Sequence, residues 1–303
     1  MVCYYPRKGW RSREVGSSGR RPIVFDPRKG YSDLPIEVPC GSCIGCRLAR
    51  SQEWAMRCHH EASLYDYNCF VTLTYSPSSL PSPPTVSVRP VQLFLKRLRK
   101  KYGSGIRFFA CGEYGETTRR PHYHLLVFNH HFGDQKFWKY NKRGEPLYTS
   151  QSLEQLWEHK GFCSIGAVTF QSAAYVSRYI MKKVTGDQAE EHYQWIDPET
   201  GEIHQLSPEF VTMSRRPGIG RGWFERWSSD VYPDDFLTIE GKKMRPPRYY
   251  DDLFAEEERK QLDRLKGARK RKAKIHEADN TPERRKVREK VKMSQISTLG
   301  REL

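Results

Sequence analysis

The sequence has no long apolar run. No stretch approaches the ~18 consecutive apolar residues of a membrane-spanning helix, and the opening MVCYYPRKGW lacks the apolar core of an export signal. These absences argue against a membrane partner and favour an intracellular protein with reduced thiols, so we do not expect a disulfide framework from the eight cysteines. The chain also lacks the G-x-x-x-x-G-K-[ST] motif, which argues against a P-loop nucleotide-hydrolysing enzyme.

Acidic residues are in short supply. Asp and Glu number 36 against 52 Lys and Arg, which gives a formal net charge of +16, and 13% of the residues are aromatic. A basic, aromatic-rich chain favours a polyanionic partner, of which nucleic acid is the first candidate. Solvated basic faces are the alternative source of this charge. The length of 303 residues fits one sizeable domain with appendages, or two domains.

Composition and apolar periodicity divide the chain into five segments. No internal repeat occurs, so each segment is interpreted separately. The segments are a loosely structured, flexible basic arm at 1–38, a cysteine cluster and helix at 39–66, a core at 67–186, an accessory hairpin and basic loop region at 187–250, and a charged helical tail at 251–303.

The core segment alternates strand and helix patterns. We expect strands at 69–75, 106–113, 122–128 and 162–170, and helices at 90–101, 152–160 and 172–184. The order βαββαβ plus one further helix predicts an α+β fold of the ferredoxin-like or RRM-like type, an antiparallel sheet with helices on one face. In this topology the first and third strands are central neighbours, and the other sheet face is open.

The third strand carries His122 and His124, which point to the same face because side chains alternate along a strand. Glu113 closes the preceding strand, and a hairpin brings its carboxylate alongside the two imidazoles. Two nitrogens and one oxygen with open positions suit Mg²⁺, Mn²⁺ or Zn²⁺. The alternative is a pair of half-exposed strand histidines beside a surface carboxylate in a Gly-Glu-Tyr-Gly turn.

The last core helix places Tyr175, Tyr179 and Lys182 on one face at helical spacing. A phenol with a pKa near ~10 is a poor nucleophile unless a cation or base stabilises the phenolate. A lysine on the same face and a metal ion opposite would supply that stabilisation. The alternative is an amphipathic helix that uses its tyrosines for packing.

A cysteine cluster, C-x2-C-x2-C, precedes the first long helix. Cys40, Cys43 and Cys46 would hold a structural Zn²⁺ if Cys58 or His59 supplied the fourth ligand. An iron–sulfur site is the second option, although the x3-C-P completion of a ferredoxin run is missing. Plain thiols are the third.

Three motifs together resemble a known family. TLTY, GEYG…RPHYHLLVF and YVSRYIMKK are similar, in order and spacing, to the three motifs of HUH-type rolling-circle replication initiators. The flanking PCGSCIGCR, SRRPGIG and RPPRYYD stretches resemble more closely the initiators of gokushovirus-like Microviridae, which are small single-stranded DNA bacteriophages. The resemblance covers about residues 39–251.

The resemblance implies an HUH endonuclease fold in the core and a nicking and joining endonuclease. His122, His124 and Glu113 would hold Mg²⁺ or Mn²⁺ at the scissile phosphate. Tyr175 or Tyr179, aided by Lys182, would attack and leave a 5′-phosphotyrosine and a free 3′-OH for rolling-circle replication of the phage genome. The other tyrosine would act when the circle is resealed.

The implied partners are single-stranded origin DNA, the double-stranded replicative form, and a host helicase and DNA polymerase in the cytoplasm of the bacterial host. DNA would lie across the open sheet face. Ordinary packing is the alternative for Phe109, and a simple chain turn for the Gly-Ile-Gly loop. The expected DNA-binding residues are Thr72, Thr74, Arg107, Phe109, Arg119, Arg120, Lys183, Arg215 and Arg216.

Two other functions remain open. A non-enzymatic, basic DNA-binding or packaging protein would explain the charge, but it gives no reason for H-x-H and Y-x-x-x-Y to occur together. A metal-dependent hydrolase with a water nucleophile would cleave without a covalent adduct.

Overall fold

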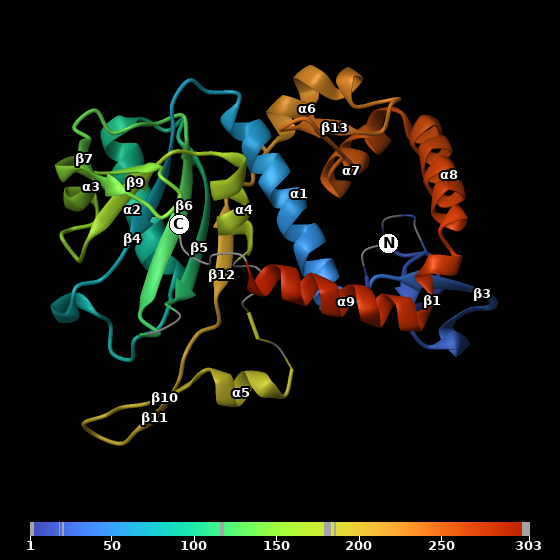
Figure 1. Ribbon diagram of the computed structural model, residues 1–303, viewed down its shortest axis with the longest axis horizontal. Helices are drawn as coiled ribbons and strands as arrows, with labels where there is room; N and C mark the ends of the chain where they lie inside the picture. Colours follow the sequence, from blue (N-terminus) through green and yellow to red (C-terminus); the bar gives the residue numbers. More distant parts are fainter. Residues whose placement is uncertain are drawn as a thin grey trace. The chain divides into compact units, whose positions relative to one another are not determined.

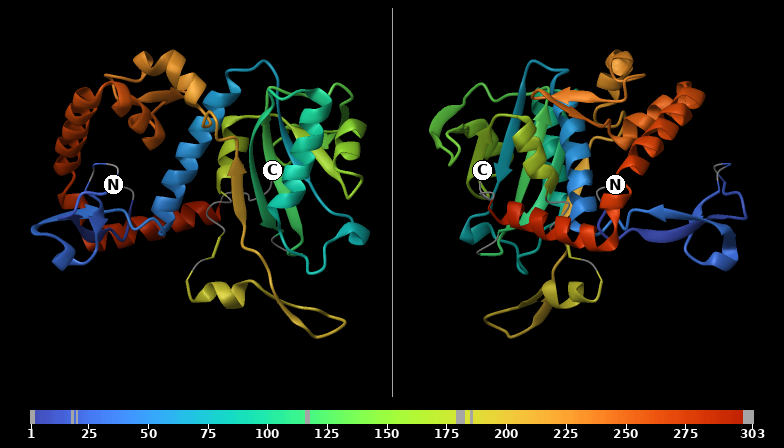
Figure 2. Two further views of the ribbon diagram at one scale, coloured as in Figure 1. Left: turned by 180° about the vertical axis from the view of Figure 1, so that it is seen from behind. Right: turned by 45° about the vertical axis from the view of Figure 1, so that its right-hand side comes forward.

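The structure is a computed structural model that describes residues 3–17, 19, 21–115, 118–178, 183–184 and 186–298 (Figures 1 and 2). The chain divides into two compact units. Unit 1 comprises Met1–Arg50 with Lys266–Gly300, and unit 2 comprises Ser51–Leu265 with Arg301–Leu303. Across the described ranges, no helix combines the length and apolar character needed to cross a membrane.

Unit 2 is built on a seven-stranded antiparallel sheet. The strand that follows α1 pairs with the strand that carries the histidines, which confirms the expected central neighbours. Three of the strands, β7, β8 and β12, are not expected from the sequence. The strand order is β12 (Phe210–Met213), β5 (Arg107–Tyr114), β6 (Pro121–Phe128), β4 (Asn68–Leu73), β9 (Cys163–Gly166), β8 (Pro146–Thr149) and β7 (Lys136–Tyr140).

One face of this sheet packs against α2 (Val88–Tyr102) and α3 (Gln151–Leu156), on the left in Figure 1. Helix α2 begins at the Ser87 cap, whose side chain accepts from the Arg89 amide, and it stops at Gly103, whose φ of 107° few other residues adopt. Its apolar stripe is fully buried, and burying each such side chain contributes about 1.5–3 kcal/mol. The stripe consists of Val91, Phe94, Leu95 and Leu98.

The other face is covered, and this corrects the expectation of an open face. Helices α1 (Ile44–Ala62) and α4 (Phe170–Arg178) pack on it through a second core cluster. Ala55 and Cys58 fall on the apolar stripe of α1, and such a stripe is stable only when it is buried. The covered region contains strand residues that open-face parity assigns to DNA. What stays accessible on this face lies near its histidine end.

The remainder of unit 2 forms two smaller groups. Helix α5 (Gln188–His192) accompanies the expected hairpin of β10 (Gln194–Ile196) and β11 (Ile203–Gln205), which extends below the sheet in Figure 1. A third core cluster joins α6 (Arg221–Trp227), the hairpin of β13 (Leu237–Ile239) and β14 (Lys242–Met244), and α7 (Arg248–Glu257). The start of the expected solvated tail is therefore packed, because α7 buries Leu253 and Phe254.

Unit 1 holds a three-stranded sheet where a flexible arm is expected. Its order is β2 (Ile23–Val24), β1 (Arg7–Ser12) and β3 (Gly30–Val38), with Arg7 opposite Val38. Long-range pairing of β1 with β3 stabilises this sheet, and local periodicity does not reveal such pairing. Helix α8 (Arg259–Ile275) runs from unit 2 into unit 1, and α9 (Pro282–Ser297) belongs to unit 1. Short 3-10 turns lie at Pro27–Lys29, Pro77–Ser79, Ser228–Asp230 and Ala278–Asn280.

Candidate metal centre

The β5–β6 hairpin assembles a three-residue cluster. Glu113 lies directly opposite His122 in the register, so their side chains share one face, and His124 joins them two residues further along. Glu113 Oε1 lies 2.8 Å from His122 Nε2 and 3.1 Å from His124 Nε2. One ligand atom from each residue falls within 4.8 Å of the others. The structure therefore brings together the three side chains that the sequence groups.

Neighbouring groups orient both imidazoles. Thr72 Oγ1 lies 3.0 Å from His124 Nδ1, and the carbonyl oxygen of Arg120 lies 3.2 Å from His122 Nδ1. Each contact holds the Nδ1 side of a ring and leaves Nε2 facing Glu113, as outer partners of metal-binding histidines do. The donor set fits a divalent cation, because two imidazole nitrogens and one carboxylate oxygen leave coordination positions open. A cation there would take the place of the protons between Nε2 and Oε1.

Glu113 is buried, yet it favours the charged form. Burial alone would raise the pKa of its carboxyl group, but hydrogen bonds from His122 and His124 outweigh burial and hold the pKa well below its ordinary value. The Gly-Glu-Tyr-Gly segment is strand rather than turn through Tyr114. Glu113 is consequently an interior ligand candidate and not a surface carboxylate.

Helix α4 places Tyr175 beside the cluster. The ring centroids of Tyr175 and His124 are 5.4 Å apart and nearly perpendicular, and the Phe70 ring stacks on His124 at 5.6 Å. The guanidinium of Arg178 lies 5.8 Å from the Tyr175 ring centroid, a cationic neighbour that the sequence analysis did not single out. Tyr179 and Lys182 lie outside the described residues.

Comparisons with known proteins match this part of the chain. Residues 68–184 match the model of the replication-associated protein ORF2 family. The chain is 32% identical to Replication-associated protein VP4 of Bdellovibrio phage phiMH2K over 84% of this chain and 77% of the relative. It is 33% identical to Replication-associated protein ORF2 of Spiroplasma virus 4 over 90% and 87%, respectively. The chain belongs to the replication-associated proteins of gokushovirus-like phages.

Family membership gives the chain a role in phage DNA replication. A third relative, Replication-associated protein ORF4 of Chlamydia phage 1, is 30% identical over 72% of this chain and 53% of that protein. No solved structure matches the chain. The matched range 68–184 contains β4, β5, β6 and α4, and so it includes the Glu113–His122–His124 cluster and Tyr175.

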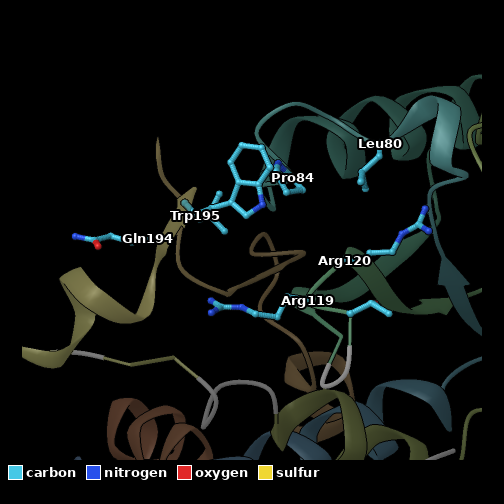
Figure 3. Close-up of a pocket in the computed structure, with 8 residues that line it drawn as sticks. Leu80, Pro84, Arg119, Arg120, Gln194 and Trp195 are labelled. Atoms are coloured by element: carbon cyan, nitrogen blue, oxygen red, sulfur yellow. The ribbon is translucent and has the colours of Figure 1, made fainter. Parts of the chain in front are cut away.

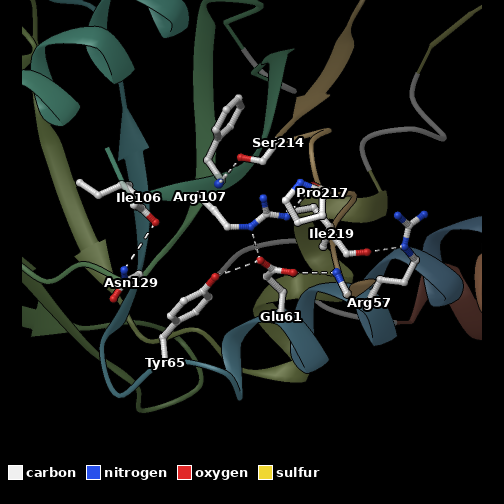
Figure 4. Close-up of polar contacts among 12 residues, drawn as sticks. Arg57, Glu61, Tyr65, Ile106, Arg107, Asn129, Ser214, Pro217 and Ile219 are labelled. Carbon is white, nitrogen blue, oxygen red and sulfur yellow. Dashed lines mark hydrogen bonds and ion pairs between the residues drawn. The ribbon is translucent and has the colours of Figure 1, made fainter. Parts of the chain in front are cut away.

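Two of the expected DNA contacts of this replication-associated protein are interior residues. Phe109 is fully buried, with its ring 5.1 Å from that of Trp54 on α1, so it packs and does not stack on a base. Arg107 forms an ion pair with Glu61 and donates to the Pro217 carbonyl at 2.8 Å (Figure 4). Both corrections follow from α1, which the sequence analysis did not place over this face.

Glu61 also anchors the basic glycine-rich loop. Its second carboxylate oxygen accepts from the Gly220 amide at 2.7 Å, and the Arg57 side chain donates to the Ile219 carbonyl at 3.0 Å (Figure 4). The end of the loop is thereby fixed on α1. Its arginines, Arg215 and Arg216, are exposed, as a DNA contact requires.

The remaining expected DNA contacts divide by environment. Thr74 donates to the Phe162 carbonyl at 2.7 Å, and Lys183 is exposed. Arg119 and Arg120 line a cavity of about 230 Å³ (Figure 3). Trp195, from β10, faces the same cavity and lies next to Pro84. The sequence analysis missed Trp195, since only folding brings the hairpin beside the histidine strand.

The cysteine cluster has a different fourth member from the one expected. Cys3 joins Cys40, Cys43 and Cys46, with the four sulfur atoms within 4.8 Å of one another. Cys58 lies on α1 about 18 Å beyond Cys46 along the helix axis. It is fully buried in the second core cluster, so it serves as a small apolar side chain.

Proposed function

We propose that this protein is a replication initiator that nicks and rejoins origin DNA by metal-dependent tyrosine transesterification. The observation that carries the proposal is the position of Tyr175 beside His124, at the edge of the Glu113–His122–His124 cluster. A nucleophile and a divalent-cation site on neighbouring elements are the two parts that phosphodiester transesterification needs.

The arrangement of the strands supports an HUH endonuclease fold on a ferredoxin-like core. Strands β5, β6, β4 and β9 lie in that order, and α2 and α3 occupy the two connections between parallel strands. Helix α4 follows β9 and returns over the histidine face. This topology makes α4 the nucleophile helix of the proposal.

Glu113, His122 and His124 hold Mg²⁺ or Mn²⁺ in this proposal. The bound ion supplies a positive charge that polarises the scissile phosphate and fixes its position. Thr72 and the Arg120 carbonyl keep the two imidazoles turned toward that place. The protein thus keeps its three ligands prealigned when DNA arrives.

The phenolic oxygen of Tyr175 or Tyr179 attacks phosphorus. A bond from this oxygen to phosphorus forms, the bond from phosphorus to the 3′ oxygen breaks, and the proton lost by the phenol is balanced by the one the 3′ oxygen gains. The products are a 5′-phosphotyrosine and a free 3′-OH. Arg178 and Lys182 stabilise the phenolate, and attack by a 3′-OH on the phosphotyrosine reverses the step and rejoins the strand.

The proposed partners follow from these products. The substrate is single-stranded origin DNA, exposed in the double-stranded replicative form, and the free 3′-OH primes the host DNA polymerase. A host helicase unwinds the duplex in the bacterial cytoplasm. Arg119, Arg120 and Trp195 around the cavity of Figure 3 offer cationic and stacking contacts to the strand near the nick.

A covalent-adduct assay tests this function. A single-stranded origin oligonucleotide labelled on the 3′ side of the nick is incubated with Mg²⁺ or Mn²⁺ and run on a denaturing protein gel. We expect label on the protein, less adduct with Tyr175→Phe or Tyr179→Phe, and none with the double variant. Cleavage without adduct would replace the tyrosines by water, and salt-sensitive binding without cleavage would favour a packaging protein.

A further inference from the structure

Four cysteines of unit 1 converge from two distant segments of the chain. Cys3 precedes β1, whereas Cys40, Cys43 and Cys46 follow β3 and lead into α1. The pairing of Arg7 with Val38 at the end of the β1–β3 ladder brings these segments side by side. Two sulfur–sulfur distances, Cys3 to Cys43 and Cys40 to Cys46, are each 4.0 Å.

These separations fit one tetrahedral ion. With Zn–S bonds of about 2.3 Å, the corners of a tetrahedron lie about 3.8 Å apart. None of the eight cysteines, all of which lie in described segments, is paired in a disulfide. The four sulfurs are therefore close enough to share a cation while each remains a free thiol.

Backbone amides point at the sulfur atoms. The Cys40 amide donates to Cys3 Sγ at 3.2 Å, the Cys43 amide to Cys40 Sγ at 3.3 Å, and the Tyr4 amide to Cys43 Sγ at 3.4 Å. Gly41, with a φ of 79°, turns the chain back so that Cys43 reaches Cys40. Donors aimed at sulfur favour thiolates, which are the ligand form of cysteine.

Unit 1 has little else to hold it together. Among its described residues, only Cys3 and Cys43 are buried apolar side chains, and all four apolar core clusters consist of unit 2 residues. A small unit without an apolar core usually needs disulfides, a metal or a partner chain to fold. The cysteine cluster is placed where such a crosslink would join both ends of the sheet to the start of α1.

We propose that Cys3, Cys40, Cys43 and Cys46 bind a structural Zn²⁺ that closes unit 1. Four thiolates favour Zn²⁺ over the hard cations Mg²⁺ and Mn²⁺, and a complete set of four protein ligands leaves no open position for substrate. The site is independent of the nicking activity proposed above, because it shares no residue with the Glu113–His122–His124 cluster.

The test measures zinc in the full-length protein by mass spectrometry after dialysis against Mg²⁺. The His122→Ala/His124→Ala variant serves as background, so that zinc at the other cluster is not counted. We expect one zinc per chain, loss of that zinc in Cys3→Ser, and full retention in Cys58→Ala. Cys58→Ala is the matched control because it removes the alternative fourth ligand.

Cobalt substitution supplies a second readout that does not depend on how well Cys3→Ser folds. Co²⁺ added to the metal-free background protein should give the visible spectrum of a tetrahedral four-thiolate site, and the same spectrum in Cys58→Ala. Zinc lost from Cys58→Ala but retained in Cys3→Ser would overturn the ligand set. Iron in place of zinc, or no metal with four oxidised cysteines, would overturn the proposal.

Discussion

The eight cysteines behave differently in the two units. Those of unit 2 lie apart from one another in apolar clusters, and burial raises the pKa of the Cys69 and Cys163 thiols to about 12. The four of unit 1 converge within 4.8 Å and receive backbone N–H donors. The comparison teaches that one residue type serves as core in one unit and as a ligand set in the other, according to what surrounds it.

The two candidate metal clusters differ in the same way. Glu113, His122 and His124 offer two nitrogens and an oxygen beside a tyrosine, whereas unit 1 offers sulfur alone. Three mixed ligands leave room for a substrate atom, and four thiolates do not. We therefore assign chemistry to the first cluster and folding to the second, and the predictions below test that division.

The largest effect is expected at the mixed cluster. His124→Ala should lower the nicking rate on the order of 10³-fold, since losing several kcal/mol of transition-state stabilisation costs tenfold in rate per 1.36 kcal/mol. Zinc content should not change. Single-turnover cleavage of a labelled origin strand measures the rate, with the exposed His131→Ala as the matched control. A parallel loss of zinc would break the division between the clusters.

The stability of unit 2 should depend on a buried ion pair rather than on metal. Glu61→Ala leaves Arg107 without its carboxylate and frees the Gly220 amide, so the free energy of unfolding should fall by about 3–5 kcal/mol. Urea denaturation measures this loss. Glu225→Ala breaks only an exposed pair with Arg221 and should change stability by less than about 0.5 kcal/mol. Equal effects of the two variants would contradict the assignment.

Acid should destabilise unit 2 through His60. Burial, with a smaller contribution from His59, lowers the pKa of His60 to about 3, so its imidazole stays neutral between Trp223 and Tyr250. The unfolded chain binds the proton near pH ~6.5. Stability from this residue is thus complete above that pH and falls by up to about 1.4 kcal/mol per unit as the pH drops toward 3.

Urea titrations between pH 7 and 4 measure this slope through tryptophan fluorescence. His60→Phe keeps an aromatic ring beside Trp223 and removes the titrating group, so its slope should be shallower. Zinc release is followed separately in the same samples, because thiolate ligands also take up protons in acid. A slope unchanged in His60→Phe would contradict the assignment to this residue.

The smallest effect is expected at the exposed basic loop. Arg215→Ala should weaken binding of single-stranded DNA a few-fold and reduce the slope of log affinity against log salt by about 0.7, as loss of one phosphate contact does. Fluorescence anisotropy at several salt concentrations measures both. Arg143→Ala, an exposed arginine in the β7–β8 turn, is the control. An equal change in both variants would mean nonspecific charge.

Local patterns predicted much of unit 2. The stripe of α2, the alternation of β6 and the hairpin that aligns Glu113 with His122 are each set by residues close in sequence. Long-range pairings were missed. Strand β12 exists because it pairs with β5, Arg107 is buried because Glu61 on α1 meets it, and Cys3 becomes a ligand candidate only after β1 pairs with β3. Contacts of this kind leave little periodic signal.

The most direct test follows nicking activity and zinc content together while a chelator is titrated into the wild-type protein. We predict that mild chelation abolishes nicking while one zinc per chain stays bound, and that Mg²⁺ or Mn²⁺ alone restores full activity. Only stronger chelation should remove the zinc and unfold unit 1. Activity that disappears in step with the zinc, and that Mg²⁺ and Mn²⁺ fail to restore, would contradict the separation of a catalytic from a structural metal.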